Sequence, residues 1–248
     1  MIEVRGLRKT FHDRKKGDVA AVRDVSFTCP PGHVFGLLGR NGAGKTTTLR
    51  MLATILSPTA GTATVAGYDI VQKPGEVRRR IGYLSGDTKL YDRLTGRELL
   101  QYFGALAGMD RNAIAARIEE QREPFRLDDL LDKRVGRMST GMKQRLSIAR
   151  VVFHDPEVLI FDEPTSGLDV IGAREVLRLV RELKGRGRTV IFSTHIMTEA
   201  ERICDEIAII EKGDILAQGT LASLLAGKPG QSLEDVFVDV VGGDADDR

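Results

Sequence analysis

Residues 39–46 combine residue types and a spacing that suit the binding of a nucleoside triphosphate. They read Gly-Arg-Asn-Gly-Ala-Gly-Lys-Thr, the pattern G-x-x-x-x-G-K-[ST]. Glycines at this spacing let backbone N–H groups point at phosphate oxygens, and a following helix adds the positive end of its dipole. Lys45 supplies a fixed charge for the outer phosphates, and the Thr46 hydroxyl can ligate Mg²⁺. We therefore assign nucleotide contacts to Gly39, Arg40, Asn41, Gly42, Ala43, Gly44, Lys45, Thr46 and Thr47.

The flanks of this loop have the strand-before, helix-after arrangement that the motif requires. The apolar run 34–38 precedes the loop. After it, residues 46–56 are apolar at helical spacing, and Ser57-Pro58 is a stop signal. The alternative, a glycine-rich turn with a chance lysine, explains neither the full spacing nor the flanks.

Two adjacent carboxylates, Asp162 and Glu163, end the apolar run 158–161. At the tip of a buried strand beside a phosphate loop, Asp162 is placed to hold Mg²⁺. Glu163 is placed to accept a proton from an attacking water, as a general base must be. His195 follows the next apolar run, where a neutral imidazole could contact the γ-phosphate and orient that water. A lone acidic pair is usually a solvated strand end and a lone histidine is usually structural, but their order here favours catalysis.

Residues 137–146 point to a second phosphate-binding surface. Ser139 is a good N-cap for a helix that we expect to run to His154. Small residues at 139–141 let an anion approach the backbone, and a helix start favours negative charge. The alternative is an ordinary capped helix, which is common, so this stretch alone leaves the choice open.

Hydrophobic periodicity predicts an α/β fold around these motifs. Two short, continuously apolar runs, 158–161 and 189–192, are typical of parallel strands that are covered on both faces. Apolar residues at helical spacing predict an inserted helical block over about 88–150. The other predicted elements are strands at 2–11, 20–29 and 62–70, a helix at 172–184, a hairpin of 207–210 and 215–218 about Lys212-Gly213, a short helix at 232–241 and an acidic tail at 242–248.

Composition and charge argue against several classes of protein. The 37 basic and 35 acidic residues give a net charge of 37 − 35 = +2, so nothing indicates nucleic acid as the main partner. Cys29 and Cys204 form no C-x-x-C pair, which favours reduced structural thiols in a cytosolic protein. Residues 1–5 do not resemble a signal peptide, and no apolar run approaches the ~20 residues that span a bilayer. Any work at a membrane is therefore expected to go through another chain.

Taken together and in order, these motifs resemble the nucleotide-binding domain of ABC transporters over nearly the whole chain. Residues 39–46 resemble the Walker A loop, and 158–163 resemble Walker B with its catalytic glutamate. Residues 139–145 resemble the family signature, 166–169 the D-loop, and His195 the switch histidine. The resemblance also implies that Phe11 lies against adenine.

The fold implied by the resemblance is a P-loop NTPase (RecA-like) core with a parallel central sheet, an antiparallel β subdomain and an inserted α-helical subdomain. The whole chain, 1–248, would form one such domain. Its core would comprise about 1–87 and 155–220, its helical subdomain about 88–154 and a C-terminal extension about 221–248.

The resemblance further implies a mechanism that one chain cannot complete. Two domains would face each other head to tail as a homodimer, with each ATP and its Mg²⁺ between the Walker A loop of one and the signature of the other. Ser139 and Gly141 would then bind the γ-phosphate of the partner's ATP, and Asp169 would lie at the dimer seam. Hydrolysis would remove the negative charge that joins the two halves.

Two stretches depart from the family pattern. The signature usually reads Leu-Ser-Gly-Gly-Gln, whereas residues 138–142 read Met-Ser-Thr-Gly-Met and keep only the serine and the second glycine. The Q-loop should carry a glutamine near position 86, where this chain has Gly86 followed by Asp87. Glycine has no side chain to ligate Mg²⁺, so Asp87 is a candidate substitute.

Within the family, four segments look like the ATPase subunit of bacterial sodium-extruding (Nat-type) exporters, namely 46–54, 65–69, 86–95 and 232–237. We therefore expect an ATP-hydrolysing motor subunit on the cytoplasmic face of the cell membrane, which drives efflux of Na⁺ or a drug through a separate permease. The region around 84–105 would dock on that permease. Leu90, Tyr91 and Leu94 would form the apolar landing surface, unless they pack inside the helical subdomain.

Other functions compete with this expectation. A soluble assembly factor of the same ATPase class would carry the same motifs, and the sequence does not exclude it. A chromosome-maintenance ATPase would need a long inserted coiled coil, and the helical block is too short and lacks sustained heptads. A small-molecule kinase would leave the signature, the D-loop and His195 unexplained.

Overall fold

The computed structural model describes residues 1–13, 17–86, 89–228 and 230–242 of the 248. The candidate substitute Asp87 and all but the first residue of the expected acidic tail lie outside the described residues. The strands are β1 (Ile2–Asp13), β2 (Gly17–Cys29), β3 (Val34–Leu38), β4 (Ala60–Val65), β5 (Tyr68–Asp69), β6 (Ile81–Ser85), β7 (Val158–Asp162), β8 (Thr189–Thr194), β9 (Glu206–Glu211) and β10 (Asp214–Gly219). The helices are α1 (Lys45–Leu52), α2 (Pro74–Arg80), α3 (Gly96–Leu106), α4 (Arg111–Arg122), α5 (Thr140–Val151), α6 (Val170–Gly185), α7 (Met197–Ile203), α8 (Leu221–Leu224) and α9 (Leu233–Gly242), with a 3-10 turn at Val135–Arg137.

One sheet joins the described strands in the order β5-β4-β1-β2-β10-β9-β3-β8-β7-β6. From β9 to β6 all neighbours are parallel, whereas β5, β4, β1 and β2 pair in antiparallel fashion. The predicted α/β class, with a parallel central sheet and a separate antiparallel part, is confirmed. The division of the chain into residue-bounded subdomains stays a prediction.

The register of the parallel strands brings their carboxyl ends into one row. Leu38 pairs with Thr194, and Asp162 lies between Ser193 on one side and Ser85 on the other. The loops that follow β3, β6, β7 and β8 therefore start side by side. This is the edge at which open α/β sheets bind ligands.

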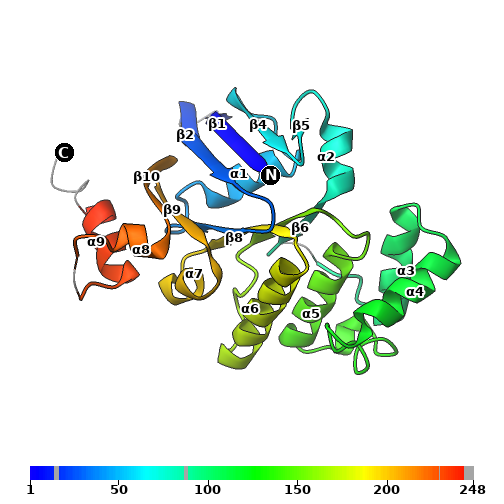
Figure 1. Ribbon diagram of the computed structural model, residues 1–248. Helices are drawn as coiled ribbons and strands as arrows, with labels where there is room; N and C mark the ends of the chain where they lie inside the picture. The colour runs from blue at the N-terminus through cyan, green and yellow to red at the C-terminus, as the bar shows by residue number, and fades with distance from the viewer. Residues whose placement is uncertain (14–16, 87–88, 229, 243–248) are drawn as a thin grey trace.

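Helices cover one face of the parallel strands, and α1 with the antiparallel strands covers the other (Figure 1). Along β7, Leu159 and Phe161 pack into the cluster that includes α5 and α6. Val158 and Ile160 pack into the cluster that includes α1 and β1. Every residue of β7 is buried, which explains its continuous apolar run.

The inserted helices begin at well-formed caps. Thr95 and Glu98 form a capping box at the start of α3, and the Asp110 side chain caps α4. At the opposite end of the molecule, α9 packs on α7 and β10, and its Leu233 and Phe237 belong to the same buried cluster as Ile207 and Ile209 of β9 (Figure 1). Among the described residues, no helix is both long enough and apolar enough to cross a bilayer.

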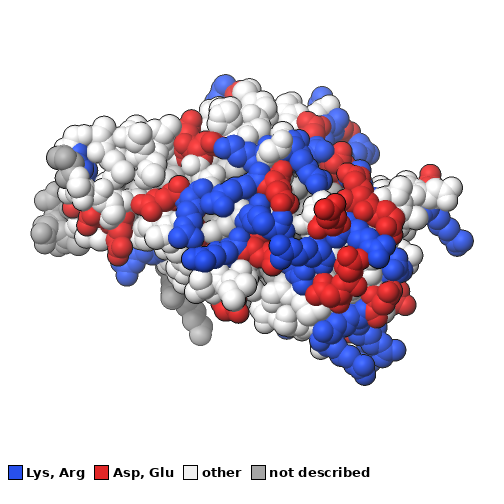
Figure 2. All heavy atoms as spheres, turned by 60° about the horizontal axis from the view of Figure 1, so that its bottom comes forward, with Lys and Arg blue, Asp and Glu red and all other residues white. Residues whose placement is uncertain are grey.

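Charged side chains of both signs interleave on the face shown in Figure 2. On the helical side of the molecule, ion pairs join Arg145 to Asp129 and Arg188 to Asp155. Such a mixed surface carries no extended field of one sign.

Several predicted elements have different bounds in the structure, and the helix expected to run to His154 ends at Val151. The helix expected at 46–56 ends at Leu52, because Thr54 adopts a left-handed φ of +60°. The strand expected at 62–70 is broken at Ala66-Gly67, whose positive φ angles make a tight turn between β4 and β5. The predicted hairpin about Lys212-Gly213 is confirmed, with the same kind of turn.

Candidate functional site

The loop between β3 and α1 carries the phosphate-binding motif and owes its shape to glycine. Gly42 and Gly44 have φ angles of +84° and +110°, a region that other residues rarely adopt. A Cβ atom at Gly39 would lie 2.3 Å from the carbonyl oxygen of Ile210. These three glycines are therefore needed for the path of the loop, and its phosphate contacts stay a prediction.

Lys45 is buried, and its ammonium is surrounded by oxygen atoms of the protein. Its Nζ donates to the carbonyl oxygens of Gly39 at 2.7 Å and of Arg40 at 3.1 Å. It also lies 3.1 Å from Glu163 Oε1. A phosphate that enters the loop must therefore replace contacts that the ammonium already makes.

Thr46 and Asp162 meet beside this lysine in an arrangement that suits a divalent cation. Thr46 Oγ1 donates to Asp162 Oδ1 at 3.1 Å, and Ser193 Oγ donates to the same oxygen at 2.8 Å. Burial raises the pKa of the Asp162 carboxyl, although both hydroxyl bonds oppose the rise. A hydroxyl next to a buried carboxylate provides the hard oxygen ligands that Mg²⁺ prefers, so both residues fit the predicted metal site.

Glu163 lies between Lys45 and His195, directly after β7. Its second carboxylate oxygen, Oε2, is 3.2 Å from His195 Nδ1. The φ angle of Glu163 is +48°, a strained value that persists only where the surroundings hold it. The structure thus brings the expected base, the expected histidine and the lysine of the loop into contact.

Ser193 is a polar side chain of this group that the sequence reasoning missed. Besides donating to Asp162, its hydroxyl accepts the Glu163 N–H at 3.0 Å. It therefore links the expected metal ligand to the expected base. The signal in the sequence is a serine that ends an apolar run two residues before His195, fully buried in the structure.

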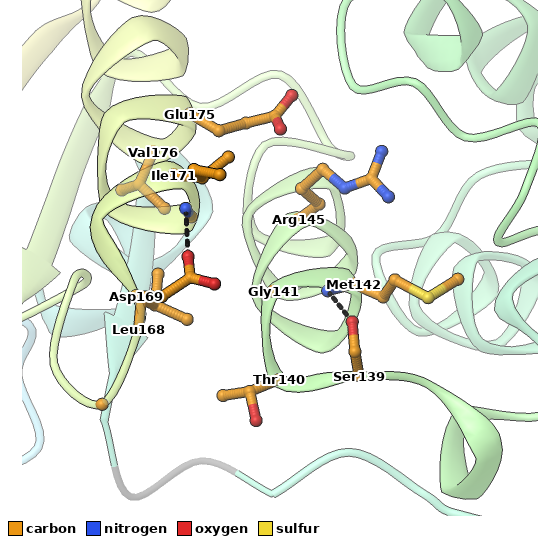
Figure 3. A pocket seen from close by; sticks show the side chains of 12 residues that line it. Ser139, Thr140, Gly141, Met142, Arg145, Leu168, Asp169, Ile171, Glu175 and Val176 are labelled. Atoms are coloured by element: carbon orange, nitrogen blue, oxygen red, sulfur yellow. Dashed lines mark hydrogen bonds between the residues drawn. The ribbon is translucent and has the colours of Figure 1, made fainter.

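The residues assigned to the second phosphate surface line a cavity of about 480 Å³ (Figure 3). Ser139 Oγ accepts the Met142 N–H at 3.3 Å and so caps α5, as predicted. Asp169 Oδ1 accepts the Gly172 N–H at 2.7 Å and caps α6. Two helix starts, each with positive dipole ends, therefore face one open space.

The two surfaces are separate from one another in the described part of the chain. Among the residues that the structure describes, no hydrogen bond or ion pair connects Ser139, Gly141 or Asp169 with Lys45 or Glu163. Gln144 on α5 donates to the carbonyl oxygen of Pro164, which ties the signature helix to the loop after β7. This contact, too, was not predicted.

Two further predicted positions make no bond to the residues described above in the part of the chain that the structure describes. Phe11 on β1 is exposed, and Lys9 Nζ lies over its ring, 5.2 Å from the centroid, so its contact with adenine stays a prediction. Gly86, after β6, is exposed, and a Cβ there would meet no atom within 4 Å. A larger side chain would therefore fit at position 86.

Comparison with known proteins identifies close relatives of the chain. A family model described as "ABC transporter" matches residues 22–166. The chain is 45% identical over 239 residues to "ABC transporter ATP-binding protein NatA" of Bacillus subtilis (strain 168), covering 96% of this chain and 97% of that protein. It is 38% identical over 236 residues to "Nod factor export ATP-binding protein I" of Burkholderia lata, covering 95% of this chain and 76% of that protein.

Solved structures agree in fold. One described as "Structure of ATP binding subunit of ABC transporter" superposes with a TM-score of 0.85 at 30% identity, covering 97% of this chain and 99% of the other. A dimeric ATP-binding cassette in a post-hydrolysis state, bound to ADP and Pi, gives a TM-score of 0.79 at 22% identity over 89% of this chain and 98% of the other. The second likeness concerns the fold alone.

Proposed function

The chain belongs to the ABC transporter family and is an ATP hydrolase of that family, and we propose that it drives an exporter. The observation that supports the hydrolytic part of this function is that Glu163 contacts His195 and Lys45 beside the Thr46–Asp162 pair. Glu163 as a base and His195 as an orienting group would thus lie next to the phosphate loop. The identity to an exporter-type relative over nearly the full length supports the transport role.

In the proposed reaction, the backbone of 39–44 and Lys45 bind the phosphates of ATP. Thr46 and Asp162 would hold Mg²⁺, which would supply positive charge to the phosphates. Glu163 accepts a proton from the water that attacks the γ-phosphorus, and His195 orients that water. Ser193 keeps Asp162 and Glu163 in a fixed relation through its two hydrogen bonds.

We also propose that ATP is bound between two copies of the chain. Ser139, Gly141 and Asp169 line a cavity that opens to solvent, and Ile171 beside them is 77% exposed. A second copy that brought its own ATP to this cavity would bury these residues. The starts of α5 and α6 would then face the γ-phosphate, and helix N-termini commonly bind anions in proteins.

The proposed permease contact is a cavity of about 740 Å³ next to α3 and α5. Its lining includes apolar Phe103 and Leu106, and Leu106 is 69% exposed. Of the expected landing residues, Tyr91 is exposed, whereas Leu90 and Leu94 pack partly buried against the core. The landing surface is therefore shifted from these two leucines toward α3, where the ring of Tyr91 stacks on Phe103.

Position on the cytoplasmic face of the membrane, a separate permease and Na⁺ or a drug as cargo complete the proposal. The test is reconstitution of the chain with a candidate permease in vesicles, followed by measurement of ATP-driven Na⁺ movement. Glu163→Gln serves as the control for ATP dependence. A chain that hydrolyses ATP but neither binds a permease nor moves cargo would point instead to the soluble assembly factor.

A further inference from the structure

Glu199 is a buried carboxylate to which the proposed reaction gives no role. It lies in the first turn of α7 and is 5% exposed. Its Oε2 accepts two hydrogen bonds, the first from Thr194 Oγ1 at 2.7 Å and the second from Thr165 Oγ1 at 3.0 Å. Burial of a carboxylate is costly unless it is hydrogen-bonded, and here both bonds come from segments that carry site residues.

The first of these bonds leads to His195. Thr194 directly precedes the histidine, and its hydroxyl also accepts the Ile196 N–H at 3.0 Å. Its carbonyl oxygen accepts the N–H of Gly39, the first residue of the phosphate loop, at 3.3 Å. The backbone on both sides of His195 is thus held through Thr194, whose hydroxyl Glu199 orients.

The second bond leads to Glu163 and Asp169. Thr165 lies two residues after Glu163, inside a turn closed by the Ser166 N–H and the Glu163 carbonyl at 3.1 Å. The Thr165 carbonyl accepts the Leu168 N–H at 3.1 Å, directly before Asp169. Thr165 therefore lies at the centre of the loop that joins the base to the cap of α6.

The last two residues of β8, Ser193 and Thr194, make hydrogen bonds on opposite faces of the sheet. Ser193 reaches Asp162 on one face, and Thr194 reaches Glu199 on the other, as the alternation of side chains along a strand requires. The Ser193 face holds the expected metal ligand and base. The Thr194 face holds the two loops that carry His195 and Asp169.

We propose that Glu199 is a positioning residue for ATP hydrolysis, which fixes the His195 segment and the 163–169 loop relative to one another. The proposal rests on the proposed roles of Glu163 and His195. Because both partners of Glu199 are hydroxyl donors, the position requires an acceptor oxygen rather than a negative charge. A glutamine whose carbonyl oxygen takes the place of Oε2 would keep both bonds.

The first test compares Glu199→Ala with Glu199→Gln in Mg-ATP hydrolysis by the full chain. Misplacement of reacting groups by about 1 Å can lower a rate by about 10²-fold, so Glu199→Ala should lower kcat by roughly 10–100-fold with little change in KM. Glu199→Gln should restore kcat to within about 3-fold of the parent, because it retains the acceptor. An unchanged kcat in Glu199→Ala, or equal losses in both variants, would overturn the proposal.

A second test asks whether Glu199 acts through His195. In a His195→Ala background, Glu199→Ala should lower kcat by a smaller factor than it does in the parent, because one of the two segments that it positions no longer carries a reacting side chain. Losses that multiply in the double variant would indicate an independent, merely structural effect.

A third test does not depend on turnover. Amide hydrogen exchange within 163–169 and 194–196 should quicken in Glu199→Ala and stay at the parental rate in Glu199→Gln. Ile203→Ala, which creates a cavity at a buried position of the same helix, is the matched control. It should not speed amide exchange selectively in these two segments. Unchanged exchange in Glu199→Ala, or a pattern equal to that of Ile203→Ala, refutes the positioning role. A parent chain without ATP hydrolysis would instead count against the proposed function.

Discussion

The two phosphate-directed surfaces of this chain are built in opposite ways. On the first, Glu163 contacts both Lys45 and His195, and the neighbouring Asp162 is buried. On the second, the side chains of Ser139 and Asp169 cap the helices that follow them and line an open cavity. Among the residues that the structure describes, the side chains of the first surface contact one another, whereas those of the second cap helices beside a cavity that opens to solvent. Such a difference is what the proposed sharing of an ATP site between two copies of the chain would require.

The largest expected effect tests the first surface. Glu163→Gln removes the proposed base, so hydrolysis should fall by roughly 10²–10⁴-fold while ATP still binds. Single-turnover phosphate release and nucleotide binding measure the two quantities separately. The mass of this variant in Mg-ATP should shift from monomer to dimer, because the shared phosphate is no longer removed. Turnover at the parental rate would show that Glu163 is not the base.

The next prediction compares one lysine from each surface. Lys45→Ala should weaken ATP binding by roughly 10–100-fold, since charge-assisted hydrogen bonds contribute about 1.5–3 kcal/mol. Lys143 on the signature helix pairs with Asp92 and is the matched control. In the isolated chain, Lys143→Ala should leave the affinity unchanged by calorimetry. Equal losses from both lysines would remove the distinction between the surfaces.

The second surface is tested by Ser139→Ala in the Glu163→Gln background. ATP affinity of the single chain should not change, but ATP-driven association should weaken by about 10-fold, because one phosphate contact worth about 1.5 kcal/mol is lost. Loss of the cap should also lower stability by about 1 kcal/mol. Asp110→Ala removes the cap of α4 and is the control for the loss of stability alone. If Asp110→Ala weakens association as much, the effect of Ser139 is only structural.

A smaller effect is expected where the first surface departs from the family. Position 86 has open space around it, so Gly86→Gln should be accommodated and should raise the Mg²⁺-dependent rate a few-fold. Gly86→Ala fills the position without a ligand and should leave the rate unchanged. If the rate rises equally in both variants, the increase comes from the reduced backbone freedom on replacing glycine and not from a Mg²⁺ ligand.

The smallest expected effect concerns the metal-free chain. Burial raises the pKa of Asp162 above that of the unfolded chain, so the folded state holds its proton more tightly and loses stability as pH rises through this value. Asp162→Asn removes the charge and should raise Tm slightly at pH 7, with the difference vanishing in acid. Mg²⁺ with nucleotide should stabilise the parent and not the variant. The sign of both shifts can be read by scanning calorimetry.

The sequence was sufficient to expect that the residues of the first surface lie together, because each of its parts is local. A phosphate loop between an apolar strand and a helix, and carboxylates at the end of a buried strand, are readable from neighbouring residues. The bounds of α1 were wrong because a threonine at position 54 gives no sign of its left-handed backbone. The break at Ala66-Gly67 had a visible signal in the glycine, which was not used.

Contacts between distant segments could not be predicted in the same way. The Lys45–Glu163 ion pair and the Gln144–Pro164 bond depend on how β3, β7 and α5 pack. Leu90 and Leu94 are apolar in sequence whether they face a partner or the core, and only packing decides. The roles of the assigned nucleotide and metal residues stay predictions until a ligand is bound.

The contact between Lys45 and Glu163 has a consequence for selectivity among anions. The ammonium at the heart of the loop is already neutralised by a carboxylate of the same chain, which is present at high effective concentration. Inorganic phosphate or sulfate, with few contacts of its own, must displace that tethered carboxylate to bind. A triphosphate can offset the displacement through the many N–H groups of the loop. We therefore expect Glu163, the proposed base, also to weaken the binding of small anions to the phosphate loop through its contact with Lys45.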